Sequence, residues 1–126
     1  MSEILTSIAQ PMRYLIELDT PLVLKKNSGM LMEGDVEANT VVLEVFKTRD
    51  VPADLSGITF SLYFTRPDGN TLQPIAGTVE GNTVRMTLTG GCYKYTGQYT
   101  MLVTMKKGEE NRTVLKATGH MEGRNT

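Results

Sequence analysis

The acidic side chains are the first residues of this sequence to test for chemistry. Two pairs lie close together in the chain, Asp50 with Asp54 and Glu109 with Glu110. A glycosidase would hold two such groups about 5 to 10 Å apart across a sugar. Here one pair falls in a turn around Pro52 and the other at a charged loop tip, where acidic residues favour turn geometry and solubility. We therefore predict no catalytic role for either pair.

The chain contains one cysteine, Cys92, and one histidine, His120. A zinc site built from these residue types needs about four ligands, and the usual nucleophilic triads and dyads are excluded as well. For Cys92 we predict a half-buried structural thiol, and for His120 a packing or surface role. No glycine is directly followed by lysine, which excludes the phosphate-binding loop G-x-x-x-x-G-K-[ST]. The sequence thus predicts a protein that is no enzyme and uses no metal or cofactor.

The tyrosines offer a binding alternative. Tyr63, Tyr93, Tyr95 and Tyr99 could line a platform for a sugar or a base, because aromatic faces stack on both. The chain has no Trp, so a carbohydrate-binding module is the alternative function and not the leading one. Tyr99 follows Gly97 by two residues and is better explained as a corner residue that bonds back to the chain. Four methionines are interpreted as core fillers: Met30, Met32, Met101 and Met105.

Length and charge limit the possible partners. The 126 residues suit a single domain, and 40% of them are hydrophobic, enough to build one core. The net charge of −1 gives no field that would attract nucleic acid or anionic lipid. No apolar run approaches the roughly 18 residues that a membrane-spanning helix needs. We predict no nucleic-acid, membrane or small-molecule ligand.

Short alternating segments separated by turns dominate the chain. Residues 40–48 are apolar on both faces at their start and predict a central strand, and residues 66–70 have the residue order of a β-turn. Residues 71–79 contain Pro74 and predict an edge strand. Further strands are predicted over 58–66, 83–88, 98–105 and 112–121, with one more in 14–18 or 22–25. About seven short strands predict an all-β fold, an immunoglobulin-like antiparallel β-sandwich, with an open barrel as the competing architecture.

The first 32 residues differ from the rest of the chain. Ile4, Leu5 and Ile8 are spaced like one face of a short helix, which Pro11 ends. Two interpretations stay open: a frayed terminus or an extra strand on the protein's own sandwich, or an arm ordered only against a neighbouring subunit. For an arm, we expect that deletion of residues 1–12 leaves the thermal midpoint nearly unchanged. The candidate partner-binding residues are Ile4, Leu5, Ile8, Met12, Tyr14 and Leu15.

An ordered series of turn-and-strand motifs runs through residues 33–122. It comprises Glu33-Gly34-Asp35, residues 39–45, Asp54-Leu55-Ser56-Gly57, Arg66-Pro67-Asp68-Gly69, Gly81-Asn82-Thr83-Val84, and Cys92-Tyr93 followed by Gly97-Gln98-Tyr99. In this order and spacing the motifs resemble the N-terminal domain family of phage baseplate upper proteins. The resemblance implies an immunoglobulin-like sandwich in a virion structural protein, where it anchors a longer C-terminal region that carries or holds receptor-binding parts. It also implies relatives at the base of head fibres and in capsid decoration.

The chain divides accordingly into an N-terminal arm with a possible first strand (1–32), the sandwich (33–122) and a tail (123–126). It stops at Thr126, where a member of the family would continue into a helical or fibre-forming segment, so we expect a compact decoration, plug or connector subunit.

The predicted function is a phage virion structural protein of tail, baseplate or capsid that docks to other virion proteins through its arm and sandwich edges. Capsid decoration or a head-fibre base is the more specific alternative. We expect a homo-oligomer or many copies in the particle, and synthesis in the cytoplasm of the host bacterium.

Overall fold

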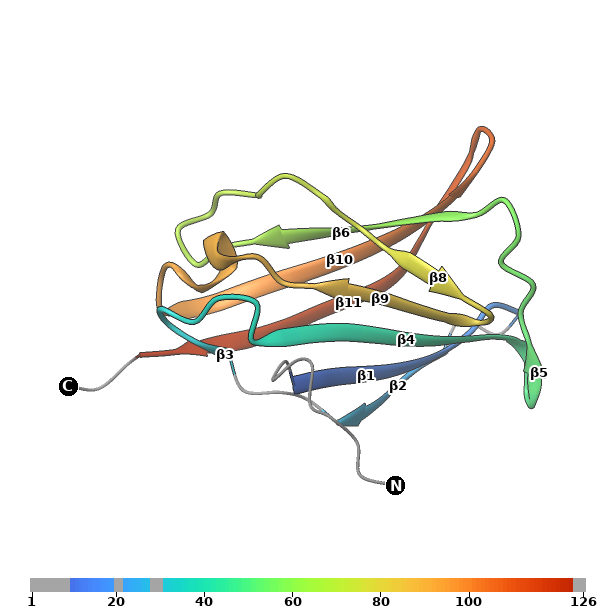
Figure 1. Cartoon of the computed structure of the whole chain (residues 1–126), viewed down its shortest axis with the longest axis horizontal. Helices are drawn as coiled ribbons and strands as arrows, with labels where there is room; N and C mark the ends of the chain where they lie inside the picture. The colour runs from blue at the N-terminus through green and yellow to red at the C-terminus, as the bar shows by residue number, and fades with distance from the viewer. Residues whose placement is uncertain (1–9, 20–21, 28–30, 124–126) are drawn as a thin grey trace, which may run out of the picture.

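The structure, a computed structural model, describes residues 10–19, 22–27 and 31–123. Two β-sheets pack face to face (Figure 1). Sheet A has the order β2 (Leu22–Asn27), β1 (Gln10–Glu17), β4 (Asn39–Thr48), β9 (Thr83–Thr87) and β8 (Thr78–Glu80), with β5 (Val51–Pro52) also paired to β4. Sheet B has the order β3 (Leu31–Met32), β11 (Glu110–Glu122), β10 (Gly97–Lys107), β6 (Thr59–Thr65) and β7 (Ile75–Ala76). The prediction of an all-β sandwich is confirmed.

Strand β4 is the centre of sheet A. It pairs with β1 in parallel and with β9 in antiparallel orientation. Val41, Val42 and Leu43 are all completely buried, so this strand is covered on both faces. The run of apolar residues on both faces therefore marks a central strand, as the sequence predicts.

The core lies between the two sheets and follows the alternation of each strand. The inward residues of sheet A include Met12, Tyr14, Ile16, Val41, Leu43, Val45, Val84 and Met86. Those of sheet B include Phe60, Leu62, Phe64, Tyr99, Met101, Val103, Leu115 and Met121. Each set comes from neighbouring strands in register, so the two faces form one continuous apolar layer.

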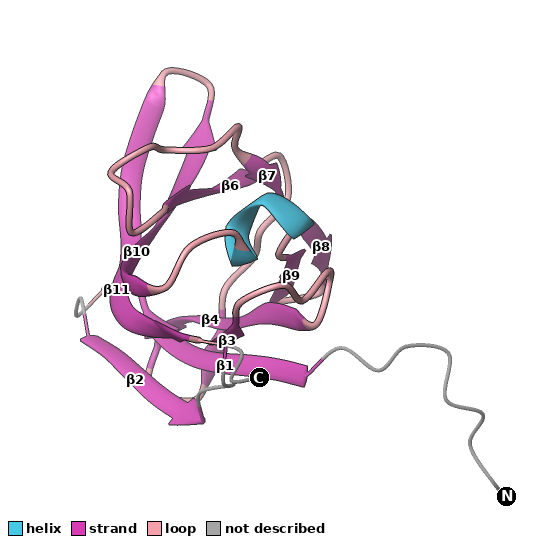
Figure 2. Cartoon of the chain, turned by 90° about the vertical axis from the view of Figure 1, so that its left-hand side faces the viewer, coloured by secondary structure: helices cyan, strands magenta, loops and turns pink. Residues whose placement is uncertain are grey.

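One end of the core is covered by the single-turn 3₁₀ helix η1 (Gly90–Tyr93), drawn in cyan in Figure 2. Tyr93 is completely buried, and its hydroxyl donates to Asn39 Oδ1 at 3.0 Å. The same hydroxyl accepts a hydrogen bond from the Asn39 backbone N–H, also at 3.0 Å. These two bonds tie η1 to the first residue of β4 and satisfy polar groups that burial removes from water.

The two sheets are joined along one side by a strand that changes sheet. β7 pairs with β6 in sheet B, and β8, one residue further on, pairs with β9 in sheet A. Gly77 stands between them, and a Cβ there would lie 2.7 Å from Val84 Cγ1 and 2.9 Å from Phe60 Cβ. Only glycine fits this corner, which gives the sandwich one feature of the competing open barrel.

The strand pattern differs from the predicted one in two respects. Eleven strands lie within the described residues, whereas about seven were predicted. One reason is that the predicted edge strand 71–79 divides into β7 and β8. The other is that short strands such as β3 and β5 contain too few residues to show an alternating pattern. Two pairings, β1 with β4 and β3 with β11, are parallel and not antiparallel. Both segments considered for a first strand are strands, and β1 lies inside sheet A between β2 and β4, so residues 10–17 form an extra strand on the protein's own sandwich. Deletion of residues 1–12 would remove the start of a central strand.

Tyr99 and Gly119 form a cross-strand pair that requires a residue without a side chain at position 119. The two residues lie directly opposite each other in β10 and β11. A Cβ at Gly119 would overlap the Tyr99 ring. The other neighbour of this ring is Phe64, which stacks on it with ring centroids 5.1 Å apart. The glycine therefore provides the space in which the tyrosine ring lies.

Met12→Ala should destabilise the protein by about 2–5 kcal/mol, because the Met12 side chain is buried in the core and its removal leaves a cavity. Urea unfolding measures the loss. The matched control is Leu15→Ala, since Leu15 lies on the same strand but is only half-buried on the opposite face. Equal and small effects of the two changes would show that β1 does not contribute to the core.

Gly119→Ala should cost about 1–3 kcal/mol in the free energy of unfolding, because the new methyl group displaces the Tyr99 ring from its contact with Phe64. Thr118→Ala, an exposed neighbour on the other face of β11, controls for strand propensity. Thermal unfolding followed by circular dichroism compares the two variants. A Gly119→Ala protein as stable as Thr118→Ala would contradict the packing of Tyr99 on Gly119.

Candidate functional site

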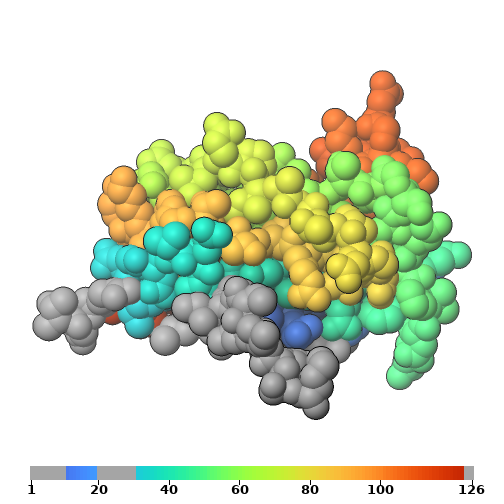
Figure 3. Space-filling model, in the orientation of Figure 1, coloured from blue at the N-terminus to red at the C-terminus, as the bar shows by residue number. Residues whose placement is uncertain are grey.

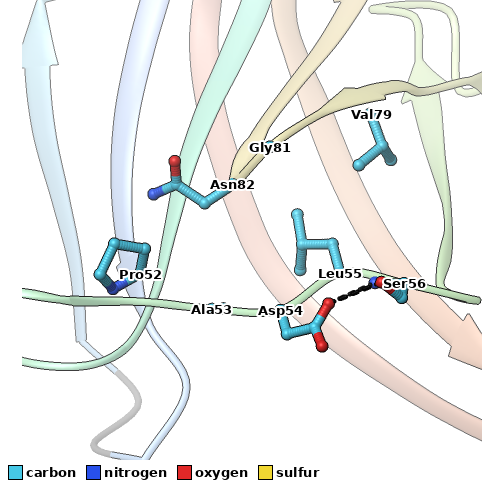
Figure 4. A pocket seen from close by; sticks show the side chains of 8 residues that line it. All are labelled: Pro52, Ala53, Asp54, Leu55, Ser56, Val79, Gly81 and Asn82. Atoms are coloured by element: carbon cyan, nitrogen blue, oxygen red, sulfur yellow. Dashed lines mark hydrogen bonds between the residues drawn. The ribbon is translucent and has the colours of Figure 1, made fainter.

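Asp54 borders a hollow of about 510 Å³ at the end of the sandwich opposite η1 (Figure 4). Its Oδ1 accepts hydrogen bonds from the Ser56 hydroxyl at 2.7 Å and from the Ser56 backbone N–H at 3.0 Å. These bonds hold the pKa of Asp54 below its usual range. No other carboxylate stands among the described residues that line this hollow, and Asp50 takes part in the turn between β4 and β5 with a φ of 63°. The Asp50 and Asp54 pair is thus used for turn geometry, as predicted.

The remaining reactive side chains are also kept apart. Cys92 is fully buried, not half-buried as expected, and burial raises the pKa of its thiol. His120 is exposed on β11, and Glu109 and Glu110 are exposed at the tip of the β10–β11 hairpin. In the described part of the chain, no three His, Cys, Asp or Glu side chains come together as a metal site requires. No helix of the described residues is long and apolar enough to cross a membrane.

The four tyrosines proposed as a platform do not meet. Tyr93 and Tyr99 are buried in the core, which uses their rings for packing. Tyr63 is half-buried on the outer face of sheet B. Tyr95 is exposed near η1, where the Arg66 guanidinium lies 5.0 Å and the Lys94 ammonium 5.9 Å from its ring centroid. Burial of Tyr93 and Tyr99 therefore leaves Tyr63 and Tyr95 as the accessible rings of the four.

The candidate partner-binding residues fall into three groups. Ile4, Leu5 and Ile8 lie outside the described residues. Met12 and Tyr14 point into the core with 1% and 3% of their surfaces exposed, so their side chains contact the protein's own interior. This corrects the assignment of these two residues to a docking surface, and the reason is the parity of β1, which turns every second side chain inward. Leu15 has the opposite parity and lies half-buried on the outer face of sheet A.

The outer face of sheet A holds a groove that the sequence motifs did not indicate, here called the sheet A groove. Its volume is about 630 Å³, and its lining residues are Pro11, Arg13, Thr40, Val42, Ile75, Ala76, Thr78, Arg85 and Thr87. In register, Arg13 stands beside Val42 and Val42 beside Arg85, so two guanidinium-bearing residues flank one buried valine. The only signal in the sequence was Val42, an apolar residue on the outward face of a strand. The groove joins residues from five strands, which sequence spacing cannot bring together.

Comparison with known proteins concerns the fold. No family model matches the sequence, and no curated protein matches it either. Among solved structures, the N-terminal domain of phage TP901-1 ORF48 is similar, with a TM-score of 0.54 and 11% sequence identity over 91% of this chain and 98% of that one. At this identity the likeness shows a shared fold and no more.

The buried tyrosines predict a loss of stability at alkaline pH. Burial raises the pKa of Tyr93 from 10.0 to about 12 and that of Tyr99 from 10.0 to about 12. Both folded-state pKa values lie above the unfolded value of 10.0. The contribution of the neutral phenols to the free energy of unfolding is therefore fully present below pH 10 and is lost as the pH rises toward 12. The thermal midpoint should therefore fall across this interval, and more steeply than in the Tyr93→Phe/Tyr99→Phe double variant. Identical slopes in the two proteins would contradict the raised pKa values.

Proposed function

We propose that the protein is a non-enzymatic structural component of a phage virion. The observation that carries the proposal is the likeness in fold to the N-terminal domain of phage TP901-1 ORF48, which extends over 91% of this chain. The order of the motifs in residues 33–122 supports it independently, because these motifs resemble a family of phage baseplate proteins. The structural use of Asp54 and Cys92 agrees with a protein that acts by binding and not by chemistry.

Docking to neighbouring subunits is assigned to the N-terminal arm and the sandwich edges. Ile4, Leu5 and Ile8 precede β1 and supply apolar side chains, and Leu15 adds a half-buried one on the outer face of sheet A. At the edge of sheet B, β3 pairs with β11 only at Met121 and Glu122. Over the rest of β11, the described residues provide no strand on this side, so backbone groups there are available for strand addition.

Within the particle we place the protein at the tail or baseplate, with capsid decoration or the base of a head fibre as the alternative location. It would be made in the host cytoplasm and assembled in several copies with other virion proteins. A carbohydrate-binding module is the rival function, and it is less well supported because Tyr93 and Tyr99 are buried. Selective binding on a glycan array, lost in Tyr63→Ala or Tyr95→Ala, would favour this rival.

Deletion of residues 1–9 should abolish incorporation into phage particles while the thermal midpoint of the purified protein changes little, because the deletion leaves β1 intact. Mass spectrometry of particles from the phage that encodes the chain measures incorporation, and electron microscopy of the same particles locates the protein. Absence of the full-length chain from purified particles would overturn the virion assignment. Normal incorporation of the shortened chain would overturn the role of the arm alone.

A further inference from the structure

The sheet A groove combines an apolar floor with a cationic rim. Pro11 and Ile75 are partly exposed and supply the accessible apolar surface, while Val42 is completely buried beneath the groove although it points away from the core. Arg13, Val42 and Arg85 form one row across three adjacent strands, so the two arginine Cα atoms lie about 10 Å apart. Arg85 is exposed, while Arg13 is engaged in another interaction. The occupant that fits is an apolar segment with one carboxylate directed at Arg85.

Polar groups of the groove support this choice of ligand. The Thr40 and Thr87 hydroxyls share a hydrogen bond of 3.0 Å, and Thr78 provides a third hydroxyl. None of the described lining residues is acidic. The described lining residues thus carry the two cationic side chains of Arg13 and Arg85 and no anionic one, although the net charge of the chain is −1. A carboxylate is attracted to this surface, and a lysine is repelled.

Residues 1–9 of the chain have the matching chemistry. Their apolar side chains include Ile4, Leu5 and Ile8, and Glu3 carries their only side-chain charge. Glu3 directly precedes Ile4 and Leu5, so a carboxylate adjoins two large apolar side chains. This is the combination that the floor and rim of the groove require.

The direction of β1 determines which molecule these residues reach. Gln10 pairs with Asn39, the first residue of β4, so the chain enters sheet A from beyond the end of that strand. The row containing Arg13 and Val42 lies three residues further into the sheet, about 10 Å away. To occupy its own groove, the segment would have to reverse direction just before Gln10. Continued outward, nine residues span up to about 30 Å, enough to reach a neighbouring molecule.

We propose that the sheet A groove binds residues 1–9 of a second copy of this chain, with Glu3 facing Arg85 and the isoleucine and leucine side chains on Pro11 and Ile75. This rests on the proposed function, because it names the surface that accepts the arm. Figure 3 views the molecule from the side on which β4, β8 and β9 lie in front. The groove opens on the outer face of these strands and not between the sheets, because its residues Val42 and Arg85 alternate with the core residues Val41 and Val84. Reciprocal exchange gives a closed dimer, and repetition from copy to copy gives a ring or a row.

A charge exchange tests the contact. Sedimentation of the full chain should show self-association that weakens about tenfold in Glu3→Lys and about tenfold in Arg85→Glu, and that recovers in the double variant. Lys116→Glu is the matched control, since Lys116 is exposed on sheet B and the substitution makes the same change in charge. Failure of the double variant to recover, or equal weakening by Lys116→Glu, would overturn the proposal.

A second experiment separates exchange between copies from binding within one copy. A chain with Ile4→Cys is mixed with a chain with Thr78→Cys under mild oxidation, and Cys92 is buried in both. A disulfide-linked heterodimer is expected, and it should be absent when Ser56→Cys replaces Thr78→Cys. A disulfide that forms only within the Ile4→Cys/Thr78→Cys double variant would show that the segment binds its own groove and would overturn the exchange.

Different outcomes would contradict the virion role and the binding of residues 1–9 in the sheet A groove. If deletion of residues 1–9 abolishes incorporation into particles but Arg85→Glu leaves self-association unchanged, the arm binds a different partner and only the groove assignment is wrong. If the charge exchange succeeds but the protein is absent from particles, the contact between copies stands and the virion role is wrong.

Discussion

Strand β4 is the element on which the other parts of the sandwich depend. Its two edges supply backbone hydrogen-bonding groups to β1 and β9, and its inward side chains form the middle of the core. A strand buried on both faces must pair on both edges, because unpaired backbone groups cannot reach water there. β4 therefore needs β1 as much as β9, and this requirement draws residues 10–17 into the domain.

The parallel pairing of β1 with β4 also determines where β1 begins and ends. Hydrogen bonds continue past the strand, from the Leu18 and Asp19 N–H groups to the carbonyls of Phe46 and Lys47. At the other end, β1 begins level with the first residue of β4. The residues that precede β1 are therefore 1–9, fewer than the 32 of the predicted N-terminal arm.

Polar side chains that could take part in chemistry stabilise turns and packing in this protein. Asp68 accepts hydrogen bonds from Arg66 at 3.2 and 3.0 Å and from Asn70 at 3.1 and 2.9 Å, which closes the turn after β6. Tyr93 ties η1 to β4 through Asn39. These hydrogen bonds hold the shape of the turn after β6 and the position of η1 over the core.

The alternation of polar and apolar residues was enough to determine the all-β class and most inward positions, because the period of a strand is local, and it favoured a sandwich over an open barrel. It also identified Asp54 and the sequence 66–70 as turn residues. Sequence alone left open whether residues 10–17 were arm or strand, since Met12 and Tyr14 would be apolar in either case. Only the tertiary structure decided this, through pairing with a strand about thirty residues away, and only it placed Arg13, Val42 and Arg85 in one row. Register between distant strands is set by the packing of the whole core, which no local pattern contains.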